Sequence, residues 1–168
     1  METQPGIPTS SRSGASAESG RHLLIYDGDC RFCHTWVLAL ARRDRRGRFD
    51  FAARGGAVSA ARGIPPLAAD DRDGDAGSVL VLPRYRESAG GARELLERSQ
   101  ALRFVLRELG GWGRPAAALL GLVPRRWLDA VYDAVARRRH RWFGGPVAAA
   151  CPLPDPAVRD RFLDLPPR

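Results

Sequence analysis

Two cysteines separated by two residues, Cys30 and Cys33, are the residues of this 168-residue chain best suited to chemistry. A C-x-x-C pair at the start of a helix can form a reversible disulfide and pass it to another molecule by thiol–disulfide exchange. Two close thiolates can also hold a soft metal ion. The spacing alone therefore leaves both a redox pair and a metal site open.

The elements around the pair decide how its sulfur atoms are presented. Residues 23–26 form a short apolar run typical of a strand, Asp27-Gly28 is typical of a tight turn, and helical periodicity follows. Residues three apart on a helix have Cβ atoms about 5–6 Å apart, whereas a disulfide needs roughly 3.5–4.5 Å. A small adjustment in the first helical turn would therefore join the two sulfur atoms.

The position in that helix predicts different roles for the two thiols. Cys33 shares a helix face with Val37 and Leu40, so we expect it to be buried and to act as the resolving thiol. Cys30 lies at the open end, beside unpaired N–H groups, so we expect it to be exposed and to attack first. Sulfur atoms too far apart to join, or both sealed in the interior, would contradict this prediction.

Charged neighbours of the pair are expected to tune its chemistry. The positive end of the helix and the guanidinium of Arg31 favour the thiolate, whereas Asp29 opposes it and is also well explained as a helix cap. Asp27 has two interpretations, a turn residue and a proton relay for Cys33 during exchange. His34 is expected to be an exposed helix residue.

The pattern Asp27-x-x-Cys30-x-x-Cys33 resembles the signature of the DCC family of predicted thiol-disulfide oxidoreductases. The stretch from Asp129 to Gly144 is similar to the C-terminal half of that family, and Ser99 before a helix fits its middle, so the resemblance spans about residues 23–151. It implies a thioredoxin-like α/β fold, with a small mixed sheet flanked by helices and extra C-terminal helices. It also implies exchange chemistry by the two cysteines.

In that interpretation the substrate is a disulfide-containing protein or small molecule, an unidentified reductant restores the dithiol, and no organic cofactor is required. No second C-x-x-C is present, and the other cysteine and the histidines lie at spacings untypical of zinc domains: Cys151, His22, His34 and His140. Two alternatives stay open, a thiolate metal-binding module or metallochaperone and a basic adaptor with non-catalytic thiols. Cys151 is either a spare thiol, a regulatory partner or a third ligand.

The chain is strongly basic, with 27 arginines, no lysine, a formal net charge of +8 and a pI near 10.8. Such a charge raises nucleic acid and anionic membrane surfaces as partners. No zinc-finger, helix-turn-helix or RNA-binding motif accompanies the arginines, so we expect no nucleic acid partner, while peripheral membrane contact stays open. The arginine-only usage, with abundant alanine and glycine, is typical of a high-GC bacterial genome.

The length fits one domain over residues 21–151, preceded by a disordered leader at 1–20 and followed by a Pro-rich tail at 152–168. The leader lacks the apolar segment of a signal peptide. The longest apolar stretch, residues 116–123, is far shorter than the roughly 20 residues that cross a bilayer. We therefore expect no membrane span and a cytoplasmic protein, in which close cysteines serve catalysis or metal binding.

The remaining elements are predicted from periodicity and from turn residues. The helix after the motif should run to about Arg46, and strands are expected at 49–51, at 79–82 and, with helical composition as a competing indication, at 93–97. Residues 54–77 are expected to be a mobile connection with one short helical turn. Ser99 should cap a helix that ends at Gly110, and helices at 115–122, at 125–140 and after Asp155 should follow. The second of these three carries an apolar stripe that we expect in the core: Trp127, Leu128, Val131, Tyr132 and Val135.

Overall fold

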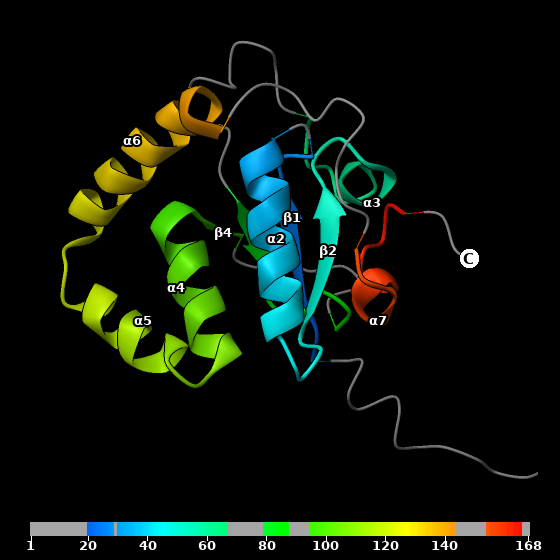
Figure 1. The fold of residues 1–168 in the computed structure, drawn as a ribbon, viewed down its shortest axis with the longest axis horizontal. Coiled ribbons are helices and arrows are strands. Elements are labelled where there is room, and N and C mark those ends of the chain that lie inside the picture. The colour runs from blue at the N-terminus through cyan, green and yellow to red at the C-terminus, as the bar shows by residue number, and fades with distance from the viewer. Residues whose placement is uncertain (1–19, 29, 67–78, 88–94, 144–153, 166–168) are drawn as a thin grey trace, which may run out of the picture.

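The computed structural model describes residues 20–28, 30–66, 79–87, 95–143 and 154–165, with side chains of 139–143 excepted (Figure 1). Asp29, Cys151, residues 1–19 of the predicted leader and residues 67–77 of the predicted mobile connection lie outside these ranges.

The described strands form one mixed sheet in the order β2-β1-β3-β4. Its strands are β1 (His22–Tyr26), β2 (Phe49–Ala53), β3 (Leu80–Leu82) and β4 (Leu96–Glu97). β1 runs parallel to β2 and antiparallel to β3, and β3 runs antiparallel to β4. The return strand favoured for residues 93–97 is thus confirmed over its last two residues. The whole is α/β, a mixed sheet with flanking helices, consistent with a thioredoxin-like fold.

Helix α2 (Arg31–Arg43) joins β1 to β2 and buries Val37 and Leu40. Its apolar face packs with residues of the sheet and of the helix after β4: Leu24, Phe49, Phe51, Val81 and Val105. The helix ends three residues before the predicted Arg46. The reason is Asp44, whose carboxylate leaves the helix to accept hydrogen bonds from the Phe49 N–H (2.9 Å) and from Arg161 (2.7 Å).

The other face of the sheet carries a second apolar cluster, which contains Leu23, Ile25 and Leu80 from the strands and Ile64 from the segment after α3 (Ala57–Ala60). α3 is the short helical turn expected after β2. All five residues of β1 are buried because this strand is covered on both faces. The cysteine motif therefore follows directly on a strand that is buried over its whole length.

Three helices lie to one side of the sheet: α4 (Arg98–Leu109), α5 (Gly113–Gly121) and α6 (Arg125–Phe143) (Figure 1). α4 contacts both of the others. It ends as predicted at Gly110, which has a φ of 72°. A Cβ on Gly113 would lie 2.2 Å from the carbonyl oxygen of Leu106, so glycine allows α5 to start directly against α4. No described helix has the length and apolar character needed to cross a bilayer.

The predicted N-cap role of Ser99 is wrong, because the N-cap of α4 is Glu97 and Ser99 lies within the first turn. The Ser99 N–H (3.3 Å) and hydroxyl both donate to Asp129 of α6, which also accepts a hydrogen bond from Arg125 (3.2 Å). Burial raises the pKa of Asp129, but the hydrogen bonds from Ser99 and Arg125 outweigh it and bring the pKa below its ordinary value. A carboxylate from α6 thus caps α4 and fixes the two helices together.

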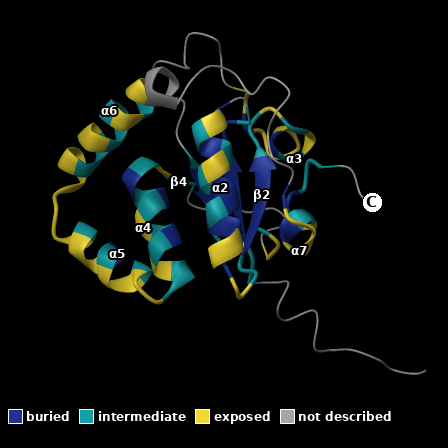
Figure 2. Cartoon of the chain, in the orientation of Figure 1, coloured by how far each residue is buried: buried dark blue, intermediate teal, exposed yellow. Residues whose placement is uncertain are grey.

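The prediction that the apolar stripe of α6 lies in the core is also wrong. Trp127 and Val131 are 61% and 63% exposed, and Leu128 and Tyr132 are only half-buried (Figure 2). α6 is an outermost element of the fold, and within the described ranges no segment covers its outer face. Periodicity identified the apolar side of this helix correctly, but the sheet does not reach it.

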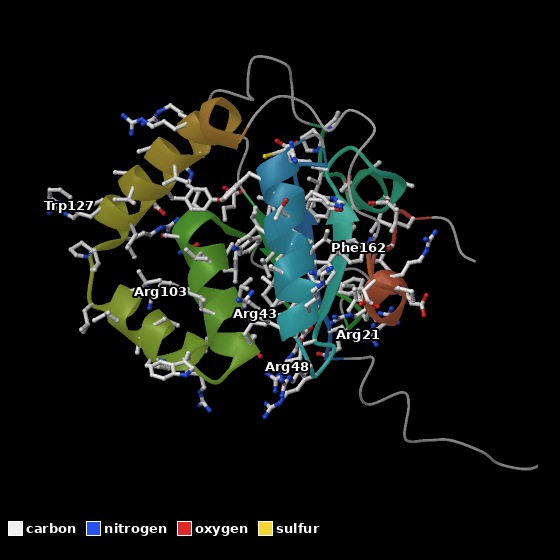
Figure 3. The ribbon with its side chains drawn as sticks, in the orientation of Figure 1. Arg21, Arg43, Arg48, Arg103, Trp127 and Phe162 are labelled. Atoms are coloured by element: carbon white, nitrogen blue, oxygen red, sulfur yellow. The ribbon has the colours of Figure 1, made fainter. Side chains whose placement is uncertain are left out.

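The segment after residue 153 packs against the free edge of β2. α7 (Pro156–Arg159) starts as predicted, with the Asp155 carboxylate accepting the Ala157 N–H at 3.0 Å. Beyond α7, Phe162 forms a parallel bridge with Phe51, and their rings stack with centroids 4.9 Å apart (labelled Phe162 in Figure 3). This contact protects the edge strand of the sheet.

Candidate active site

Cys30 and Cys33 lie where β1 turns into α2. Cys30 is the N-cap of α2, with extended backbone angles, and its Sγ accepts a hydrogen bond from the Cys33 N–H at 3.3 Å. Both cysteines are free thiols. The predicted strand, turn and helix therefore place the pair on the first turn of a helix, as expected.

Asp27 completes a compact cluster with the two thiols. Its carboxylate oxygen and the two sulfur atoms all lie within 4.8 Å of one another. Because an S–S bond is about 2.05 Å long, the sulfurs have to approach by at most about 3 Å to form a disulfide. The condition that the sulfur atoms be close enough to join is met.

The prediction that Cys30 is exposed is wrong, because Cys30 is 2% exposed and Cys33 is 4% exposed. As an N-cap, the Cys30 side chain folds back over the first turn, and both cysteines join the apolar cluster that contains Leu24 and Val37. A negative charge on the Cys30 sulfur would be stabilised there by the Cys33 N–H and by the positive end of α2. The low exposure limits how a substrate can reach the pair.

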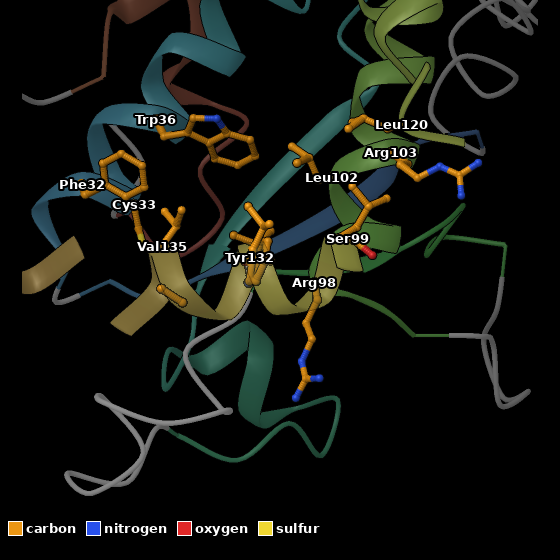
Figure 4. A pocket seen from close by; sticks show the side chains of 14 residues that line it. Phe32, Cys33, Trp36, Arg98, Ser99, Leu102, Arg103, Leu120, Tyr132 and Val135 are labelled. Carbon is orange, nitrogen blue, oxygen red and sulfur yellow. Dashed lines mark hydrogen bonds between the residues drawn. The ribbon is translucent and has the colours of Figure 1, made fainter. Parts of the chain in front are cut away.

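A cavity of about 280 Å³ adjoins Cys33 and is bounded by α2, α4, α5 and α6 (Figure 4). Val131 and Val135 belong to its wall and are also exposed, so the cavity opens to solvent along α6. Cys33 is therefore buried, but it lies on the wall of a cavity that is only partly enclosed. The lining is largely apolar: Phe32, Cys33, Trp36, Val79, Arg98, Ser99, Leu102, Arg103, Leu120, Leu128, Val131, Tyr132, Val135 and Ala136.

A buried C-x-x-C pair beside an open cavity agrees with what the comparison with known families shows. The family model for DCC1-like thiol-disulfide oxidoreductases matches residues 24–145, well over half of the chain. The chain belongs to the DCC1-like thiol-disulfide oxidoreductase family. The match starts within β1 and extends through α6, so the cysteine motif and the cavity walls both lie inside it.

One curated relative of this DCC1-like chain comes from Bacillus subtilis (strain 168) and carries the name uncharacterized protein YuxK. The two are 28% identical over 148 residues, which cover 88% of this chain and 98% of YuxK. No solved structure matches the chain.

Two cavity residues of this DCC1-like chain had no predicted role in the site. The Tyr132 hydroxyl accepts a hydrogen bond from the Val79 N–H at 3.0 Å, which ties α6 to the start of β3. Arg98 has a φ of 50°, unusual for a residue with a side chain, and its Nε lies 3.7 Å from Asp133. Tyr132 was predicted to be core, because an apolar stripe that lines a cavity has the same periodicity as one that packs in a core.

The other predicted tuning residues are less closely tied to the thiols. Arg31 is the exposed first residue of α2. His34, expected to be exposed, is half-buried, with its ring centroid 6.1 Å from that of Tyr26. The backbone N–H of His34 donates to the Cys30 carbonyl at 3.0 Å. Tyr26 packs over this histidine and reduces its exposure.

Proposed function

We propose that this protein catalyses thiol–disulfide exchange and that Cys30 and Cys33 cycle between a dithiol and a disulfide. The observation that carries the proposal is the cluster of two sulfur atoms and the Asp27 carboxylate within 4.8 Å, at the N-terminus of α2. The family to which the chain belongs supports the reaction type. The substrate class is a protein or small molecule that contains a disulfide.

Cys30 is the proposed nucleophile, because the Cys33 N–H and the end of α2 stabilise negative charge on its sulfur. Its thiolate attacks one sulfur of the substrate disulfide. The substrate S–S bond breaks as a mixed disulfide with Cys30 forms, and the released substrate thiolate takes up a proton from water.

Cys33 then resolves the mixed disulfide. Its thiol passes its proton to Asp27, and the resulting thiolate attacks the Cys30 sulfur, so that the second substrate sulfur leaves as a thiolate. The Asp27 oxygen lies within 4.8 Å of the Cys33 sulfur, a distance that one water or a small movement can span. The protein has now lost two electrons, and an external dithiol reductant returns them. Such reductants abound in the cytoplasm, which is the proposed compartment.

The cavity reaches Cys33 but not Cys30, the proposed nucleophile. The substrate disulfide must therefore enter beside Cys33, or the first turn of α2 must move outward. Either route predicts that small thiol reagents react with the folded protein faster than bulky ones do.

The test uses a chain in which Cys151→Ser removes the third cysteine. Reduction of oxidised glutathione and of insulin is measured with dithiothreitol as the reductant. We expect Cys30→Ser to abolish turnover, and Cys33→Ser, incubated with oxidised glutathione in the absence of dithiothreitol, to stop at a mixed disulfide on Cys30, identified by mass spectrometry. The matched control, Cys151→Ser alone, should keep full turnover.

Undiminished turnover in Cys30→Ser would contradict the proposal. A mixed disulfide that forms on Cys33 in the Cys30→Ser chain, and none on Cys30 in the Cys33→Ser chain, would reverse the assigned order of the two thiols.

A second candidate function, thiolate metal binding, is favoured by the same cluster. Cysteine sulfur and carboxylate oxygen are both zinc ligands, and three donors within 4.8 Å fill three of the four positions of a tetrahedral site. Metal content of protein purified without chelator separates the two candidates. Stoichiometric zinc that is lost in Cys30→Ser, with no disulfide turnover in the parent chain, would favour the metal site.

A further inference from the structure

The outer side of α5 and α6 exposes large apolar side chains. We call this the α5–α6 surface and define it by Trp112, Leu119, Leu122, Trp127 and Val131, of which Trp112 is 92% and Leu122 is 81% exposed. Figure 2 shows the exposed residues of both helices on their outer sides, and in Figure 3 Trp127 points away from the molecule. Five large exposed apolar side chains on two consecutive helices and their ends exceed the single exposed apolar residues that are normal on a protein surface, and they indicate a site of interaction.

The exposed charges in residues 110–138 are positive. In residues 110–138 the acidic residues are Asp129 and Asp133, whose side chains are only 16% and 25% exposed. Asp129 accepts hydrogen bonds from Ser99 and Arg125, and Asp133 lies beside Arg98. In contrast, the arginines of the same segment are all exposed: Arg114, Arg125, Arg126, Arg137 and Arg138. The surface thus combines indole and aliphatic groups with excess positive charge.

We propose that the α5–α6 surface docks on an anionic lipid bilayer. Tryptophan rings favour the boundary between lipid headgroups and acyl chains, and leucine and valine enter the apolar zone beside them. Arginines next to such groups extend their apolar stems along the boundary and reach the lipid phosphates with their guanidinium groups. The proposal stands on exposure and charge and does not depend on the thiol chemistry.

A second copy of this chain fits the surface less well than a bilayer does. Two facing copies would bring exposed arginines of both chains near one another, and residues 110–138 offer no exposed carboxylate to neutralise them. Like charges at this density oppose association. An anionic bilayer supplies both the apolar layer and the negative charge that this surface lacks.

The docked bilayer would also lie beside the cavity that adjoins Cys33. Val131 belongs both to the α5–α6 surface and to the cavity wall, and the exposed Val135 follows it on the same helix. Docking would therefore direct the mouth of the cavity towards the membrane surface.

The test is flotation of the full chain with vesicles of phosphatidylcholine alone and of phosphatidylcholine with phosphatidylglycerol. We expect binding to the anionic vesicles only, weakened by salt. Trp112→Ser with Leu122→Ser should lower the bound fraction about ten-fold, and Arg114→Gln with Arg126→Gln should lower it several-fold. The matched control is Arg45→Gln with Arg46→Gln, which removes the same charge from exposed residues after α2 and should change binding less than about two-fold.

Three results would overturn the proposal. The first is absence of binding to anionic vesicles at low salt, and the second is an equal loss of binding in the two arginine pairs, which would show attraction by net charge alone. The third is a dimer in size-exclusion chromatography that Trp112→Ser with Leu122→Ser abolishes, without vesicle binding. If the apolar double variant fails to fold, the comparison of the two arginine pairs still decides.

Discussion

The sheet and the α5–α6 pair differ in how far their apolar residues are buried. Every residue of β1 is buried, whereas in the stretch from Gly113 to residue 138 Ala117 is the one residue that is buried. Both regions are rich in apolar residues, but only the first is covered by a layer on each side. The cysteine pair therefore belongs to the well-packed half of the molecule, whereas the cavity beside it is bounded in part by helices with a free apolar face.

Carboxylates that hold elements together are also more deeply buried in the sheet than in the helical half. Asp50 in β2 is fully buried and is held by Arg21 (2.7 Å), by the Tyr85 hydroxyl and by Arg86 (3.4 Å). Burial, together with the hydrogen bond to Asp50, raises the pKa of Tyr85. The corresponding carboxylate of the helical half, Asp129, joins α4 to α6 nearer the surface. We expect substitutions in the two halves to differ accordingly.

A large effect is expected for Asp50→Ala, which leaves Arg21 and the Tyr85 hydroxyl without this acceptor. Breaking a buried ion pair by removing one partner costs about 3–5 kcal/mol in the free energy of unfolding. Urea denaturation measures the loss. The exposed Asp160 provides the control, since Asp160→Ala should change stability by less than about 0.5 kcal/mol. Equal effects of the two substitutions would remove the distinction between the halves.

A smaller loss, about 1–2 kcal/mol, is expected for Asp129→Asn, because it weakens the cap on α4 and the pairing with Arg125. The folded-state pKa of Asp129 lies below its ordinary value of 3.8, so the folded protein favours the carboxylate. Its contribution is therefore complete above that pH and is lost as the pH falls through the folded-state pKa. The unfolding temperatures of the unsubstituted chain and of Asp129→Asn should therefore converge in acid. A difference that grew on acidification would contradict the assigned cause.

The packed half was largely predictable from the sequence, and the errors lie where tertiary context decides. The strand before Cys30, the helix after it and the strand at Phe49 follow from local pattern, and the structure confirms them. Ser99 was predicted to be a cap because its type favours that position, but Asp129, distant in sequence, supplies the capping group. Local pattern carries no information about such a partner.

The errors in the site have the same origin. Cys30 was expected at the solvent because helix ends are usually open, yet its side chain folds back on the first turn and is covered. The cavity was missed because its walls come from helices far apart in sequence, and periodicity cannot say whether a stripe such as that of Trp127 is covered. The burial of Cys33, Val37 and Leu40 was predictable, because all three share one helix face, whereas the burial of Cys30 and the exposure of the α6 stripe were not.

His22 in β1 is expected to make the free energy of unfolding depend on pH, by at most about 1.4 kcal/mol per pH unit. Burial lowers its pKa below the ordinary 6.5, although Glu108 opposes this, and its Nδ1 accepts the Arg84 N–H at 3.0 Å. The unfolded chain therefore binds a proton that the folded chain excludes. Stability should be level above about pH 6.5 and fall as the pH drops towards the folded-state pKa.

His22→Asn provides the comparison, because its amide oxygen can take the place of Nδ1 and does not titrate. The stability of this variant, measured by urea denaturation from neutral pH into the acid range, should lack the His22 component of the decline. An identical pH profile in the two chains would exclude His22 as its source.

The smallest effect is expected for Trp112→Ser on the exposed half. Its side chain is 92% exposed, so the free energy of unfolding should change by less than about 0.5 kcal/mol. Phe51→Ala, which removes a buried ring stacked on Phe162, should cost about 3–5 kcal/mol. Thermal unfolding of the two variants compares the halves directly. A large loss in Trp112→Ser would mean that this side chain is covered in solution.

The redox state of the Cys151→Ser chain shows whether Cys30 and Cys33 join and separate reversibly. The reduced chain is equilibrated in buffers of increasing oxidised to reduced glutathione, quenched by alkylation and weighed by mass spectrometry. We expect the chain to lose the mass of two hydrogens reversibly, with both cysteines protected from alkylation together. Two thiols that stay free over the whole range, or that accumulate separate glutathione adducts, would contradict it.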